Sequence, residues 1–157
     1  MTKLIIKHEK WNRGQALIEL TLLLPLLVLI LLGTIDFGRV FFQSMALAQA
    51  ARAGAQYGAQ SVDKSSDTAG MQGAAVDAGQ DIGLALTDVT SARRYFLCGG
   101  GDTNEYTVEP VSPPCGDGKP AMIYVEVTVQ KTFTTMFNYP GFPHSINLNR
   151  TARIRAR

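Results

Sequence analysis

LTLLLPLLVLILLGTI, residues 20–35, is a run of sixteen residues without a charged side chain. Ala16–Glu19 extend the run to 20 positions that hold a single charge, Glu19. Twenty helical residues at about 1.5 Å each reach about 30 Å, the thickness of the hydrocarbon core of a bilayer. The run has no polar stripe of the kind that the core helix of a soluble protein turns towards water. The sequence therefore predicts a helix that spans a membrane.

The flanks of this run predict its orientation. The first 14 residues hold four basic side chains against Glu9, and the far side opens with Asp36 and Arg39. Cytoplasmic flanks of membrane helices are enriched in Lys and Arg. We therefore expect a single-pass protein of the bacterial inner (cytoplasmic) membrane, with a cytoplasmic N-terminus and a periplasmic C-terminal domain. An ordinary cleaved secretory signal has a shorter apolar core, whereas a signal-anchor fits this run.

Composition excludes several classes of function. A chain of 157 residues has room for one modest domain, and its 18% of charged residues is below the roughly 25% of an average soluble domain. A formal charge of +2 is too small to indicate a nucleic-acid partner. The two histidines, His8 and His144, lie far apart, and neither a phosphate-binding loop nor an activated nucleophile is recognisable. We predict no catalytic residue, no metal site and no cofactor.

Glu19 is the one charge within the predicted span. A carboxylate at the centre of a membrane helix costs about 2.5–3.5 kcal/mol, less near the headgroups, so such a residue usually has a partner or a function. Five positions upstream, Gly14 ends the basic leader, and the sequence GQALIE at 14–19 resembles the processing site of type IV pilin-like precursors. The resemblance implies that a membrane peptidase cuts between Gly14 and Gln15. The new α-amine of Gln15 would then pair with Glu19 of a neighbouring subunit.

Four motifs narrow the resemblance: RGQALIE at 13–19, LPL at 24–26, DFGR at 36–39 and QAARAGA at 49–55. Together, over about residues 12–60, they resemble the TadE-like minor pilins, or pseudopilins, of the tight-adherence (Tad or Flp) type IV pilus system. The resemblance implies a part in assembling a pilus for surface adhesion and a place in the extracellular pilus. It also implies as partners a prepilin peptidase, the major Flp pilin, other TadE-like or TadF-like minor pilins, the inner-membrane assembly platform and membrane lipid. The alternative is an uncleaved, signal-anchored periplasmic domain that binds or senses a ligand.

The predicted helix continues past the membrane. Small residues share one face at every fourth position from Ala46 to Gly58, which permits close approach of another helix or a sheet. This face is interpreted either as a contact between subunits or as packing on the chain's own sheet. Pro25 is expected to kink or loosen the helix, and the spacing of Asp36 and Arg39 favours a local ion pair. The predicted assembly residues are Glu19, Pro25, Asp36, Arg39, Ala46, Ala50, Gly54 and Gly58.

The chain thus divides into three predicted parts: a basic leader at 1–14, a transmembrane and assembly helix at 15–60, and an outer domain at 61–157. In the outer domain, residues 61–70 are rich in Ser, Asp and Gly and predict a linker, and apolar spacing predicts a second Ala-rich helix at 71–86. Alternating patterns predict strands at 89–97, 106–111, 122–133 and 146–157. The expected fold is α+β and type IV pilin-like, with an antiparallel sheet of about four strands.

Two cysteines, Cys98 and Cys115, both follow the predicted span. An oxidising periplasm and the turn-forming residues between them favour a disulfide, although two free thiols remain the alternative. A metal site would need more ligands than two thiols and the distant His144.

Overall fold

The computed structural model describes residues 12–98, 105–106, 115, 121–137, 141 and 143–156. The chain forms two compact units, Met1–Arg39 and Val40–Arg157. Of the predicted leader, residues 1–11 lie outside the described residues. The boundary between the two units falls within a helix, so the predicted domain bounds at residues 14 and 60 stay predictions.

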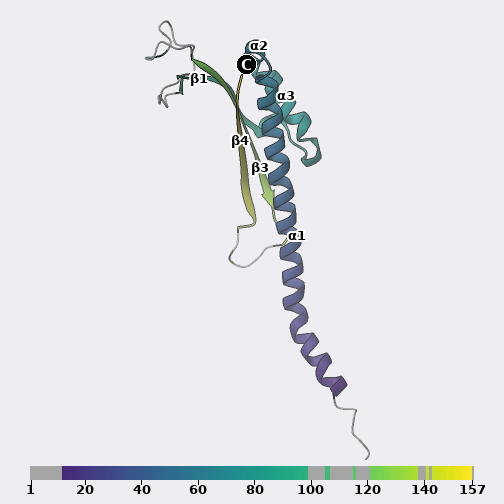
Figure 1. Ribbon diagram of the computed structural model, residues 1–157. Helices are drawn as coiled ribbons and strands as arrows, with labels where there is room; N and C mark the ends of the chain where they lie inside the picture. Colours follow the sequence, from purple (N-terminus) through teal and green to yellow (C-terminus); the bar gives the residue numbers. More distant parts are fainter. Residues whose placement is uncertain are drawn as a thin grey trace, which may run out of the picture. The chain divides into compact units, whose positions relative to one another are not determined.

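Helix α1 runs from Asn12 to Gly58, close to the predicted bounds (Figure 1). It continues through Pro25, which has no N–H to donate to the carbonyl one turn earlier. The hydroxyls of Thr21 and Thr34 each donate to the carbonyl four residues back, at 2.7 and 2.8 Å. This bond satisfies the only polar group of each threonine side chain, so both residues fit within an apolar helix.

The predicted linker at 61–70 is wrong, because two helices occupy it. Helix α2 is Val62–Ser66 and helix α3 is Thr68–Ala78. The Ser61 Oγ accepts a hydrogen bond from the Lys64 N–H at 3.2 Å, and the Asp67 Oδ1 accepts one from the Gly70 N–H at 2.9 Å. The Ser and Asp residues that suggested a linker are therefore N-caps, which satisfy the free N–H groups at the start of each helix.

The second helix also ends earlier than its apolar spacing predicts. Helix α3 stops at Ala78, and the N–H of Gly79 donates to the carbonyls of Ala75 and Val76. Gly83 then adopts the left-handed conformation, with φ of 62°, which favours glycine. A single 3-10 turn lies on each side of Gly83, η1 at Gln80–Ile82 and η2 at Leu86–Asp88. Residues 79–86 are thus a turn region, and the apolar positions that continued the helical pattern do not lie in one helix.

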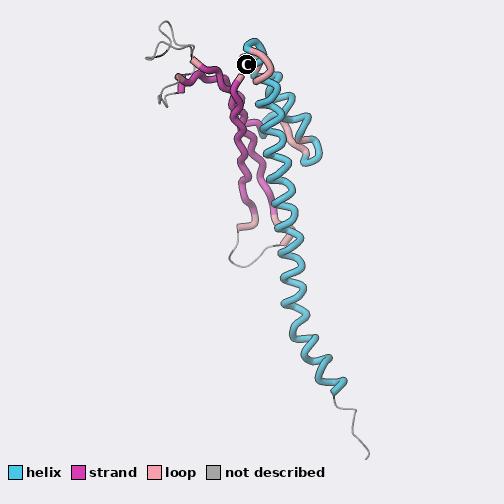
Figure 2. Tube along the Cα trace, in the orientation of Figure 1, coloured by secondary structure: helices cyan, strands magenta, loops and turns pink. Residues whose placement is uncertain are grey.

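The sheet has the order β2-β1-β3-β4, with every neighbouring pair antiparallel (Figure 2). Three long strands form most of it: β1 (Val89–Leu97), β3 (Met122–Thr134) and β4 (Ser145–Arg155). Strand β2 is the pair Glu105–Tyr106, and the rest of the predicted strand at 106–111 lies outside the described residues. The predicted α+β fold with an antiparallel sheet is confirmed.

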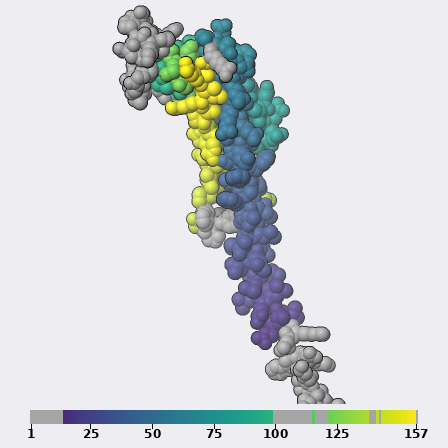
Figure 3. Space-filling model, viewed as in Figure 1, coloured from purple at the N-terminus to yellow at the C-terminus, as the bar shows by residue number. Residues whose placement is uncertain are grey.

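One face of the sheet packs on the second half of α1. Val125, Val127 and Val129 of β3 are fully buried, together with Leu47 and Ala51 of the helix. Figure 3 shows β4 lying alongside this part of α1. Helix α3 contributes Met71 and Ala75 to the same core. The core of the second unit therefore lies between the sheet and two helices.

Glycine permits a close contact between the backbones of α1 and α3 in this core. A Cβ placed on Gly54 would lie 2.7 Å from the Met71 carbonyl oxygen and 3.2 Å from the Val127 side chain. A carbonyl oxygen of a helix cannot move aside as a flexible side chain can. The residue at position 54 must therefore lack a side chain for α1, α3 and β3 to meet.

We predict that Gly54→Ala lowers the free energy of unfolding by about 1–3 kcal/mol, because the added methyl group overpacks the core. The matched control is Gly73→Ala in α3, where a Cβ meets nothing within 4 Å. The control should raise stability by about 0.5–1 kcal/mol, because alanine is the better helix former. Circular dichroism of the full chain in detergent during urea unfolding measures both. Equal effects at the two positions would contradict the close packing at Gly54.

Candidate functional site

The first unit presents an apolar helix surface. Eleven large side chains from Leu17 to Ile30 are each at least 43% exposed: Leu17, Ile18, Leu20, Leu22, Leu23, Leu24, Leu26, Leu27, Val28, Leu29 and Ile30. The most apolar 18-residue window of α1 has a mean hydropathy of 2.6, and none of it is buried. Among the described residues, α1 is the one helix long and apolar enough to cross a membrane, judged by length and composition. Such a surface is stable only against lipid or against other apolar helices.

The predicted processing residues lie at the start of this surface. Gly14, Gln15 and Glu19 are all exposed, and a Cβ on Gly14 would meet nothing within 4 Å. Gln15 and Glu19 are four positions apart in a helix, so their side chains project from the same face. The geometry leaves the Gly14–Gln15 bond open to another protein and keeps Glu19 close to the end that cleavage would create.

The apolar run ends at an ion pair. The Arg39 Nη1 lies 3.0 Å from the Asp36 Oδ1, as the spacing of three predicts, and Asp36 is only 5% exposed. Because the two charges neutralise each other, the first charged residues after the run add no net charge there. Pairing also lowers the free energy of holding a carboxylate out of water.

The family model described as TadE-like protein matches residues 14–56. Residues 14–56 are therefore similar to the TadE-like proteins. The match begins at Gly14 and falls within the range of about 12–60 predicted from the motifs. Proteins of this family are associated with the Tad pilus and are generally structural rather than enzymatic. No curated protein and no solved structure gives a match to the chain.

The TadE-like segment covers just over a quarter of the chain and ends inside α1. Its second half contains the predicted small-residue face. Ala46 is half-buried, whereas Ala50, Gly54 and Gly58 are buried against the chain's own α3 and β3. The small-residue face was interpreted either as a contact between subunits or as packing on the chain's own sheet. At these three positions it packs within the chain. The opposite face of α1 is polar and exposed, with Gln49, Arg52 and Gln56.

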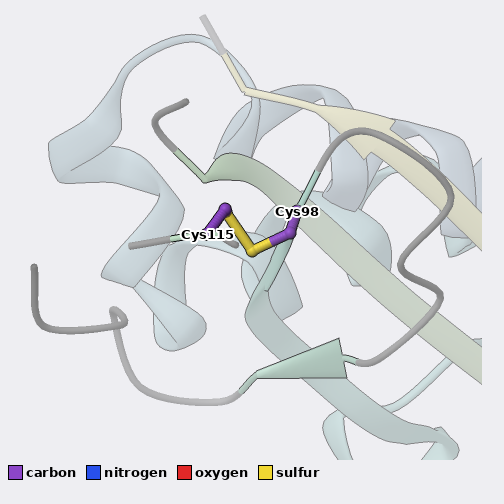
Figure 4. Close-up of a disulfide and its surroundings, with 2 residues drawn as sticks. All are labelled: Cys98 and Cys115. Atoms are coloured by element: carbon purple, nitrogen blue, oxygen red, sulfur yellow. A yellow bond between two sulfur atoms is a disulfide. The ribbon is translucent and has the colours of Figure 1, made fainter. Parts of the chain in front are cut away.

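The cysteines of the outer domain are joined. Cys98, one residue beyond the end of β1, forms a disulfide with Cys115, with the two Cα atoms 5.5 Å apart (Figure 4). Both residues are buried. The predicted disulfide is confirmed, and it holds the end of β1 to a point 17 positions further along the chain.

We predict that the double replacement Cys98→Ser with Cys115→Ser lowers the free energy of unfolding by about 3 kcal/mol, because the unfolded chain regains the entropy of an open loop of this length. Urea unfolding of the full chain in detergent measures the difference. Reducing the wild-type chain should give the same loss and leave the double variant unchanged. An effect of reductant on the double variant would show that something other than this bond responds.

The outer face of the sheet carries a charged cluster that the sequence analysis missed. Glu126 of β3 is directly opposite Arg93 of β1 and Arg153 of β4. Its two carboxylate oxygens accept hydrogen bonds from the Nε atoms of Arg93, at 2.9 Å, and Arg153, at 2.5 Å. Both guanidinium groups also lie over the ring of Tyr95, which is buried. The alternation of β3 placed Glu126 on this face, but only the strand register shows that its two neighbours are arginines.

The cluster gives Glu126 a shifted pKa. Burial raises the pKa of Glu126, but the hydrogen bonds and positive charges of Arg93 and Arg153 outweigh burial, so the pKa lies below its ordinary value of 4.5. Glu126 therefore remains ionised in the folded chain at pH values where it would be protonated in the unfolded one. Within the described residues no three His, Cys, Asp or Glu side chains gather as a metal site would require. The cluster is a structural support for the sheet.

We predict that Glu126→Gln lowers stability at pH 7 by about 1–2 kcal/mol, a modest value because the arginines are partly exposed and solvent screens them. The folded pKa is the lower one, so the carboxylate contributes fully above about pH 4.5 and its contribution disappears as the pH falls through the folded value. The free energies of unfolding of the wild type and of Glu126→Gln, measured between pH 7 and 3, should therefore approach each other as the pH falls. Asp77→Asn, at an exposed position of α3, is the control. A difference that stays constant with pH would refute this role of the charge.

Proposed function

We propose that the protein is a minor pilin, or pseudopilin, that takes part in assembling a Tad/Flp pilus for surface adhesion. The observation that carries the proposal is the TadE-like match, which begins at Gly14 and continues through the exposed apolar helix. A helix with this surface suits two environments, lipid before assembly and neighbouring pilin helices after it. The exposed apolar helix fits a structural role.

In this proposal a prepilin peptidase hydrolyses the peptide bond between Gly14 and Gln15. Water supplies the hydroxyl to the carboxylate of the released leader and a proton to the new amine of Gln15. The exposed position of Gly14 gives the peptidase access. Glu19 of a neighbouring subunit then neutralises the amine, so that two charges that are costly in an apolar environment become one ion pair.

The same proposal gives the protein its place in the cell. The chain crosses the bacterial inner membrane once, with its N-terminus in the cytoplasm and residues 61–157 in the periplasm, and it enters the extracellular pilus from there. The bond between Cys98 and Cys115 supports this side for the outer domain, because disulfides persist in oxidising compartments. Its partners are the peptidase, the major Flp pilin, other TadE-like or TadF-like pilins, the assembly platform in the inner membrane and membrane lipid.

Processing is testable by intact mass. Co-expressed with the peptidase of its host, the wild-type chain should lose residues 1–14, and Gly14→Leu should retain them because a bulky side chain blocks the site next to the cut bond. The matched control is Gly33→Leu in the same helix, where a Cβ also meets nothing within 4 Å. The control should be processed normally.

Pili formed by the three strains give the second measurement. Gly14→Leu should abolish the incorporation of this chain into pili, whereas the wild type should be incorporated. Residues 1–14 retained in the mature wild-type protein of its own host would refute the processing step. That result would favour the alternative, an uncleaved, signal-anchored domain that binds or senses a ligand.

A further inference from the structure

Two arginines of the second unit lie on the side of α1 that faces β4. Gly54 contacts α3, and Arg52, two residues earlier, projects from nearly the opposite side of the helix, because successive helical residues are about 100° apart. Ser44, eight residues before Arg52 and within about a quarter of a turn of it, accepts a hydrogen bond from the Nη2 of Arg150 in β4. Helix α3 and strand β4 lie on different sides of α1 (Figure 1). We call Arg52 and Arg150 the basic flank.

The basic flank carries positive charges that the described chain does not neutralise. In the second unit α1 holds one charged residue, Arg52, and β4 holds three arginines and no acidic residue. Two of the three, Arg153 and Arg155, lie on the outer face of the sheet, where Arg153 pairs with Glu126. Arg52 and Arg150 are exposed, and neither forms an ion pair with another described residue.

The segment on the other side of α1, formed by α3 and the turns after it, carries only negative charges. From Thr68 to Asp88 there are three aspartates and no Lys, Arg or Glu. Asp88 pairs with Lys131 at 3.4 Å. Asp77 of α3 and Asp81 of η1 are exposed, and neither forms an ion pair with another described residue. We call Asp77 and Asp81 the acidic flank.

The acidic flank lies at the level of the arginine of α1. Gly54 of α1 lies against Ala75 of α3. Four residues later in α1, Gly58 lies against Met71, which is four residues earlier in α3. The two helices are therefore antiparallel. Two residues beyond Ala75, Asp77 is about level with the helix residue two positions before Gly54, which is that arginine.

The arginine of β4 lies close to the same level. Val127 of β3 lies against Gly54 and is directly opposite Ala152 of β4. Arg150 is two strand residues, about 6.6 Å, before Ala152, which places it about one turn of α1 before Gly54. Its guanidinium reaches Ser44, further in the same direction. Opposite charges thus occur at similar heights on different sides of the second unit.

We propose that a second copy of this chain covers the basic flank, with Arg52 and Arg150 of one copy against Asp77 and Asp81 of the next. Second units that stand side by side with parallel α1 helices bring these charges together without a shift along the helix. The contact joins two different surfaces, so each copy keeps one flank free for a further copy and the contact can repeat. The proposal rests on the proposed assembly role, in which copies of the chain stand side by side in one membrane.

Charge complementarity favours a second copy as the occupant. Two basic flanks repel each other, and so do two acidic flanks, so the contact between unlike flanks is the one that the charges select. A single exposed ion pair contributes little free energy, but chains held in one membrane have a high local concentration, so a few pairs suffice. Such a contact weakens as salt shortens the screening length, from about 10 Å at 0.1 M to about 3 Å at 1 M.

Energy transfer between labelled copies of the full chain tests the proposal. Because both native cysteines are joined in the disulfide, Thr132→Cys introduces a single reactive thiol, at an exposed position on the outer face of the sheet. Donor-labelled and acceptor-labelled chains are reconstituted together at high dilution into phosphatidylcholine vesicles, whose lipid carries no net charge. The transfer efficiency then reports how closely the second units approach each other.

Charge reversals are made in this labelled background. One variant reverses the basic flank, Arg52→Glu with Arg150→Glu, and a second reverses the acidic flank, Asp77→Lys with Asp81→Lys. A third variant carries all four changes. The matched control is Arg155→Glu, which reverses an exposed arginine of the same strand on the outer face of the sheet.

We expect the energy transfer of the unreversed chain to fall about twofold or more between about 50 mM and about 500 mM salt. At the lower salt concentration, each double reversal should lower the transfer by as much, and the control should leave it unchanged. The variant with all four changes should recover the transfer, because its two flanks are again of opposite sign. A mixture of the two double variants, one with the donor and the other with the acceptor, should recover it too. If Arg150→Glu disturbs the fold, Arg52→Glu and Asp77→Lys as single changes make the same comparison.

Transfer that responds neither to salt nor to the reversals would overturn the proposal, and so would a control that loses as much transfer as the double variants. Failure of both the four-change variant and the mixture to recover transfer would also overturn it, and would assign the arginines to another protein or to anionic lipid. The intact mass of the wild-type chain, measured after co-expression with the peptidase, separates these results from the proposed function. If residues 1–14 are removed as expected, the assembly role stands and only this contact fails.

Discussion

The close approach of α1 to β3 and α3 at Gly54 and Gly58 is the contact on which the second unit depends. Without side chains at these positions, the helix backbone lies within van der Waals distance of Met71 and of the valines of β3. This distance sets the register between helix and strand, and the register fixes which end of the sheet meets the start of the unit. The buried valines contribute stability in proportion to the apolar area that they remove from water.

Helix α1 therefore combines two kinds of surface in one element. Its leucine-rich half makes no contribution to the core cluster, whose helix members begin at Leu47 and continue to Ala55. Its alanine- and glycine-rich half is needed for the fold, because Ala50, Ala51 and Ala55 belong to the buried core. The TadE-like match extends over both halves and stops before α2, so the feature shared with the family is this helix.

Patterns within single segments of the sequence predicted those helices and strands that form from residues close together in the chain. The strand at 89–97 has the predicted bounds, and the long apolar helix and the disulfide also agree with the sequence. Ser61 and Asp67 show the limit of composition, because the same residues suit a linker and an N-cap, and only hydrogen bonds to Lys64 and Gly70 distinguish the two. The cluster around Glu126 could not be predicted from spacing, since the three strands that build it are paired across 33 and 27 positions.

The disulfide has a consequence for proteolysis. Cys98 and Cys115 enclose the whole connection from β1 through β2 towards β3, so a single cut of the backbone at any bond between them leaves both products covalently attached. The two products would retain β1 on one side and the β3–β4 hairpin on the other, held together by the sheet as well as by sulfur. A nicked chain of this kind would keep its full mass until it is reduced, and its outer domain would tolerate damage in this connection that would divide an unlinked chain into two fragments.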